Sequence, residues 1–156
     1  DFNGAVSATT TITISNAVLS SAGDSDQSIY FALTFAGSLS VSGGTMTATD
    51  SSGVYFTQDL TGTASFTNVA ITATGWGVAV AGAITGGHLT VSGGTISSGL
   101  SGVLANTVVD AASSVSLLDG WSITTTTIGN PCLYLKGAVK RRRVQSHRNS
   151  LERRRH

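Results

Sequence analysis

Three aspartates in the first third of the chain, Asp24, Asp26 and Asp50, have the clearest potential for chemistry. Each follows an apolar residue of a recurring pattern by nine to twelve positions, so we expect them in neighbouring outer loops. Paired carboxylates can catalyse glycoside hydrolysis or bind a hard cation such as calcium. Ordinary acids in solvent-exposed loops would show the same spacing. No catalytic motif, metal cluster or phosphate loop accompanies the three aspartates. We therefore predict no catalytic residue, no metal site and no cofactor, with these aspartates as the candidates to examine.

Aromatic side chains form a second group of candidates. Tyr30 and Tyr55 each lie between apolar neighbours, at a position expected to point outward, and Tyr134 repeats this arrangement near the end. Stacked outward tyrosines can contact a glycan or a protein surface, so Tyr30 and Tyr55 are the ligand-binding candidates. Ala79 and Leu104 take the same place in the intervening units, which predicts an interrupted strip. The two tryptophans are expected in corners, where they would cover the flank: Trp76 and Trp121.

Hydroxyl side chains recur at a third set of equivalent positions. A flat array of threonines can bind ice, but such a face needs two regular threonine columns. Serine interrupts the one column that we identify, so we interpret it as ordinary outward strand residues and keep ice binding as a further alternative. The column contains Thr13, Ser40, Ser65, Thr90 and Ser116.

These candidates recur because the sequence itself repeats, at intervals of 27, 25, 25 and 26 residues. A repeat of this kind predicts stacked structural units. The first landmark is an apolar residue within an alternating run: Ile14, Val41, Phe66, Val91 and Leu117. The second is a short apolar triplet: Ile29–Phe31, Val54–Phe56, Val78–Val80, Val103–Ala105 and Leu133–Leu135.

Each unit shows the alternation of apolar and polar residues that is typical of β-strands, and it lacks helical spacing. Between two of its strands stands a residue that tolerates positive φ. We predict a tight corner there, with one left-handed residue in every unit: Asn16, Gly43, Asn68, Gly93 and Gly120. The last unit has one extra residue at this point. Units of about 25 residues stacked in parallel make an all-β solenoid of about five turns.

Composition and charge divide the chain near residue 136. Charged residues make up only 11% of the sequence, and all nine Lys and Arg follow residue 135, while residues 1–135 hold seven aspartates. We predict a parallel β-helix over 1–135 and a basic tail over 136–156, disordered or forming a short helix.

A single cysteine, Cys132, excludes an intramolecular disulfide and a cysteine-based zinc site. The absence of a long apolar stretch predicts no membrane span. Basic clusters can bind nucleic acid, anionic lipid or acidic glycan, but with the charge confined to the tail we do not expect nucleic acid as the partner.

The body resembles right-handed parallel β-helices, as in pectate-lyase-like proteins and in the passenger domains of bacterial autotransporters and related adhesins. The corner residues and the two Ser-Gly-Gly-Thr phrases, 42–45 and 92–95, carry this resemblance over residues 1–135. The resemblance implies the right-handed fold, and it also implies that members cleaving acidic polysaccharides place a cationic side chain beside the acids. Residues 1–135 contain no Lys or Arg, and His88 is their only histidine.

We therefore expect a non-enzymatic scaffold or adhesin segment that is secreted or located at the cell surface. A polysaccharide-active enzyme of the same fold is the alternative, and an ice-binding protein is the third possibility. Stacked turns end in open strand edges, so we also expect a neighbouring chain or subunit to cap the ends. A glycan or a protein surface is the expected partner.

Overall fold

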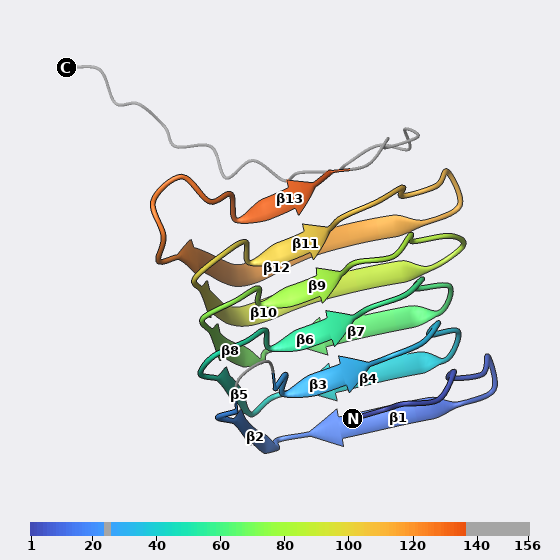
Figure 1. Ribbon diagram of the computed structural model, residues 1–156, viewed down its shortest axis with the longest axis horizontal. Coiled ribbons are helices and arrows are strands. Elements are labelled where there is room, and N and C mark those ends of the chain that lie inside the picture. The colour runs from blue at the N-terminus through green and yellow to red at the C-terminus, as the bar shows by residue number, and fades with distance from the viewer. Residues whose placement is uncertain (24–25, 137–156) are drawn as a thin grey trace.

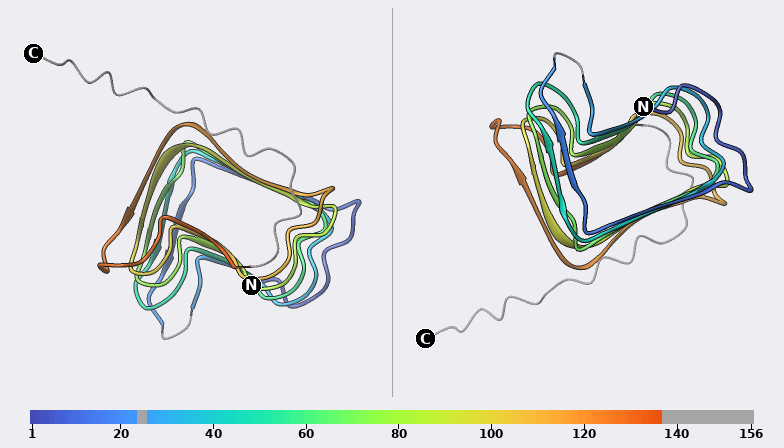
Figure 2. Two further views of the ribbon diagram at one scale, coloured as in Figure 1. Left: turned by 90° about the horizontal axis from the view of Figure 1, so that it is seen from above. Right: turned by 90° about the horizontal axis from the view of Figure 1, so that it is seen from below.

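The computed structural model describes residues 1–23 and 26–136 and shows a parallel β-solenoid of about five coils (Figure 1). The predicted fold class is confirmed. All strand pairs are parallel, and consecutive coils superimpose closely when viewed along the axis (Figure 2). The basic tail lies outside the described residues from position 137 onward, so its predicted form stays a prediction. The described part of the chain has no helix that is both long enough and apolar enough to cross a membrane.

Three stacks of strands form the sides of the solenoid. The first side contains β1 (Thr11–Ser15), β4 (Ser38–Ser42), β7 (Thr63–Thr67) and the first halves of β10 (His88–Ser98) and β12 (Ser114–Thr125). The second side contains β2 (Val18–Ser21), β5 (Thr45–Ala48), β8 (Ala70–Ala73) and the second halves of β10 and β12. The third side contains β3 (Ile29–Phe31), β6 (Val54–Phe56), β9 (Val78–Val80), β11 (Val103–Ala105) and β13 (Leu133–Leu135).

The corner between the first and second sides lies where the sequence predicts it, but in the second and fourth coils two residues rather than one have positive φ, Gly43 with Gly44 and Gly93 with Gly94. All five predicted corner residues have positive φ, from 50° at Asn16 to 84° at Gly120. Only Asn and Gly adopt this conformation at low cost, which explains their restriction to this column. The extra residue of the last unit is absorbed by a shift in the pairing of β10 with β12, between Ser92 and Gly94.

Alternation along each strand sends one set of side chains into a continuous apolar core. On the first side the inward residues Leu39, Val41 and Leu89 are almost completely buried. A ladder of phenyl rings fills the first coils, because Phe31 stacks on Phe56 with ring centroids 4.8 Å apart and Phe35 packs edge-on against both. Each coil therefore completes the core of its neighbours, as expected for a repeat stack.

The two ends of the stack expose cross-sections of this core. Ile12, Ile14 and Leu19 in the first coil are only partly buried, whereas their partners in the second coil are buried. The last coil shows the same pattern at Val115, Leu117, Ile123, Leu133 and Leu135. Among the described residues, no strand pairs with the outer edges of β1, β2, β12 or β13.

Candidate functional site

The described candidate carboxylates, Asp26 and Asp50, lie in loops that lead from the second side to the third. Asp24 falls outside the described residues, and Asp26 and Asp50 are both exposed. The Gln27 side chain donates a hydrogen bond of 2.8 Å to the Ser51 hydroxyl, so the loops carrying Asp26 and Asp50 lie side by side on consecutive coils. Within residues 1–23 and 26–136 no group of three or more His, Cys, Asp or Glu residues forms a metal-binding cluster.

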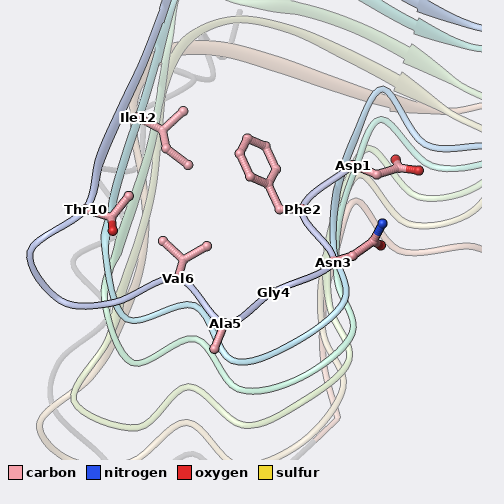
Figure 3. A pocket seen from close by; sticks show the side chains of 8 residues that line it. All are labelled: Asp1, Phe2, Asn3, Gly4, Ala5, Val6, Thr10 and Ile12. Carbon is pink, nitrogen blue, oxygen red and sulfur yellow. The ribbon is translucent and has the colours of Figure 1, made fainter.

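A pocket opens at the first end of the solenoid, away from these loops. It is lined by residues 1–6 together with Thr10 and Ile12. The side chains of Phe2, Val6 and Ile12 face one another, while Asp1 and Asn3 point away from them (Figure 3). This pocket is therefore the exposed end of the apolar core, and its lining pairs no acid with a base.

The aromatic strip on the third side is longer than the sequence indicates. Tyr30 and Tyr55 pair in register and their rings stack with centroids 6.3 Å apart, at an angle of 17°. Trp76 then stacks on Tyr55 with centroids 5.9 Å apart, at 8°. In the next coil the tyrosine position holds Ala79, which is fully buried, so the Trp76 ring takes the place that a tyrosine would fill.

This stacking determines which parts of the rings remain free. Tyr30, Tyr55 and Trp76 are all half-buried, and each ring covers a face of its neighbour. A sugar ring that stacks on an aromatic residue needs an open aromatic face. The stack therefore closes both faces of Tyr55 and one face each of Tyr30 and Trp76 to a partner. Leu104 is buried and Tyr134 is 42% exposed, so the exposed aromatic surface resumes only in the last coil.

The hydroxyl column of the first side is in register along all five coils, and it is flanked by two further columns. One flank holds Thr11, Ser38, Thr63, His88 and Ser114, and the other holds Ser15, Ser42, Thr67, Ser92 and Leu118. Some flanking side chains bond to each other along the stack. The His88 ring, for example, shares a 2.9 Å hydrogen bond between its Nδ1 and the Ser114 hydroxyl, so this histidine is one member of a surface ladder.

The second side carries two outward columns that the sequence reading did not single out. One column holds Val18, Thr45, Ala70, Thr95 and Ser122, and the other holds Ser20, Thr47, Thr72, Ser97 and Thr124. The signal in the sequence is a hydroxyl–apolar–hydroxyl pattern that begins two residues after the corner residue in three of the five units, at 45–47, 95–97 and 122–124.

Two other acids stabilise corners of the backbone. An Asp59 carboxylate oxygen accepts a 2.8 Å hydrogen bond from the Ala83 amide in the next coil. Asp110 accepts hydrogen bonds from the Ser113 hydroxyl and from the amides of Ala112 and Gly86. The Ser113 hydrogen bond, followed by those from the backbone amides, lowers the pKa of Asp110 because it favours the charged carboxylate. These contacts indicate a structural role for both acids.

The parallel strand pairing and the three in-register sides together define the chain as a parallel β-solenoid repeat protein. Comparison with protein-family models, curated proteins and solved structures found no match. The assignment to this class therefore rests on the strand pairing of the chain itself.

Proposed function

We propose that this chain is a non-enzymatic solenoid scaffold whose sides present extended surfaces for binding. The observation that carries the proposal is the neutral surface of the first two sides. None of the outward positions in their five columns holds Asp, Glu, Lys or Arg, and most hold Ser or Thr. Rigid repeat stacks with such uniform sides typically act through extended surface contact. Tyr30 and Tyr55 remain the predicted contacts for a glycan or a protein surface on the third side.

A secreted or cell-surface location and an adhesin-like role belong to the same proposal. The resemblance to autotransporter passenger domains and pectate-lyase-like proteins supports it, together with the near-absence of cysteine and the low charge of the body. The coil geometry agrees with that resemblance at the level of a parallel solenoid.

The alternative, a polysaccharide-active enzyme, has weaker support from the described residues. Asp26 and Asp50 lie on adjacent loops, but residues 1–135 have no Lys or Arg to neutralise a uronate. The one histidine of that region, His88, lies on the first side and bonds to Ser114, whereas the two acids lie in loops beyond the second side. A cleavage mechanism that needs acid and cation together is therefore disfavoured.

We expect the purified chain to release no reducing ends and no unsaturated products from polygalacturonate or from a neutral glucan. The measurement is a reducing-sugar assay combined with ultraviolet absorbance of the products. Asp50→Ala serves as the matched variant. Cleavage by the unmodified chain that disappears in Asp50→Ala would overturn the scaffold proposal in favour of the enzyme.

We also propose that a neighbouring chain or subunit covers the ends of the stack. Support comes from the half-exposed Ile12, Ile14 and Leu19, whose counterparts one coil further on are buried. Light scattering across a concentration series is expected to show self-association, which Ile14→Lys reduces. A strictly monomeric chain at the highest concentration, without any added partner, would contradict association between copies.

A further inference from the structure

The second side differs from the first in how its hydroxyl groups are used. On the first side, flanking side chains bond to each other from coil to coil, as between Ser15 and Ser42 at 3.2 Å and between Ser38 and Thr63 at 3.1 Å. Among the described residues, no side chain in the two outward columns of the second side forms a hydrogen bond within the protein. These hydroxyls are therefore available to an external partner across the whole side.

The chemistry of the second side narrows the kind of partner. Its two outward columns hold Thr, Ser, Val and Ala only, without a charge or an aromatic ring. The aromatic strip lies on a different sheet, so sugar rings find no stacking platform here. An ionic ligand finds no counter-charge on this side. The complementary partner is a neutral, flat surface that donates and accepts hydrogen bonds at regular intervals.

The outward positions of the second side are regularly spaced in two directions, and eight of the ten carry a hydroxyl, the exceptions being Val18 and Ala70. Outward residues of one parallel strand are separated by two steps of about 3.3 Å, and neighbouring coils by about 4.8 Å. In the central coils Thr45, Thr47 and Thr72 are exposed, and the threonine side chain is stiff at χ1 because of its branched Cβ. A rigid array of this kind loses little conformational entropy on contact, which favours binding to a lattice.

We propose that the second side binds ice. The hydroxyl and methyl groups of its two outward columns contact the surface of the ice lattice. This inference rests on the proposed scaffold function and assigns one of its binding faces. The relevant observation is the pair of in-register columns, in which five of the ten positions are threonine and three are serine, with Val18 and Ala70 as the exceptions. Ice is a neutral surface with periodic hydrogen-bonding groups, which is the kind of partner that this uncharged and regularly spaced side can contact.

The full chain tests this proposal through thermal hysteresis and through its enrichment in slowly growing ice. Thr72→Lys places a charge at the centre of the second side. Ser65→Lys places the same charge in the same coil on the first side, and so is the matched control. We expect hysteresis and ice enrichment for the unmodified chain, loss of both in Thr72→Lys and retention in Ser65→Lys. Circular dichroism and melting temperature establish that each variant is folded.

If Thr72→Lys does not fold, the double variant Thr47→Val and Thr72→Val removes two hydroxyls at almost unchanged volume, and we expect it to lower the hysteresis. Absence of hysteresis and ice enrichment in the unmodified chain overturns the proposal, as does equal loss in the folded Lys variants. If the unmodified chain shows no hysteresis but binds microcrystalline cellulose, and Thr72→Lys weakens that binding, the ice proposal is overturned and the second side is assigned to a glycan instead. None of these results bears on polysaccharide cleavage, which separately tests the scaffold function.

Discussion

Replacing Gly44 with alanine is expected to lower the free energy of unfolding by about 3 kcal/mol or more. Gly44 has a φ of +77°, and an added Cβ would lie 2.1 Å from the carbonyl oxygen of Ala17 and 2.7 Å from its amide nitrogen. Both contacts are with the backbone of the preceding coil, so the coils would have to separate at the corner. Urea denaturation followed by circular dichroism measures the loss.

Gly86→Ala provides a matched control for this experiment. Gly86 also has positive φ, +68°, but nothing lies within 4 Å of an added Cβ. We expect it to cost only about 1 kcal/mol, the price of a left-handed non-glycine residue. If the two variants lost the same free energy of unfolding, the close approach of the coils at Gly44 would contribute nothing to the effect of Gly44→Ala.

The second large effect is expected for Phe56→Ala in the phenyl ladder, with a loss of about 3–5 kcal/mol. Phe56 is fully buried, stacks on Phe31 at 4.8 Å and packs edge-on against Phe35 at 5.5 Å. Removing its ring leaves a cavity between coils and breaks two aromatic contacts. Because each coil is stabilised by its neighbours, we also expect urea unfolding to lose its single sharp transition.

Phe2→Ala tests whether the loss of stability depends on where in the stack of coils the phenylalanine lies. Phe2 stacks on Phe31 at the same centroid distance of 4.8 Å, but it is 37% exposed at the end of the solenoid. We expect a clearly smaller loss than for Phe56→Ala. A loss at Phe2 as large as that at Phe56 would contradict the view that burial between coils provides the stability.

The corner residues show why much of the fold is predictable from the sequence. The left-handed conformation admits few residue types, so the requirement is visible at Asn16, Gly43, Asn68, Gly93 and Gly120. The alternation of Asn and Gly also has a packing reason. A Cβ at Gly43 would lie 2.3 Å from the Asn16 side-chain oxygen, and one at Gly93 would lie 2.1 Å from that of Asn68. The asparagine side chain of one coil therefore occupies the space beside the next corner, and it would have to rotate to admit a residue larger than glycine there.

The candidate sites were less predictable, because they depend on contacts between coils. Trp76 lies outside the tyrosine column in sequence, yet its ring continues the stack on Tyr55. The adjacency of the loops carrying Asp26 and Asp50 was predicted from the repeat, and the bond between Gln27 and Ser51 agrees with it. The role of those aspartates, and of Tyr30 and Tyr55 as ligand contacts, stays a prediction.

Inward and outward residues differ in how far the sequence alone determines their role. The sequence alone determined the repeat, the inward residues and the left-handed corners, because strand alternation and positive φ restrict residue types locally. Only the tertiary structure decided which outward residues act together. Outward positions tolerate many residues, and their meaning arises when Thr47 and Thr72 meet in register across coils or when Trp76 stacks on Tyr55.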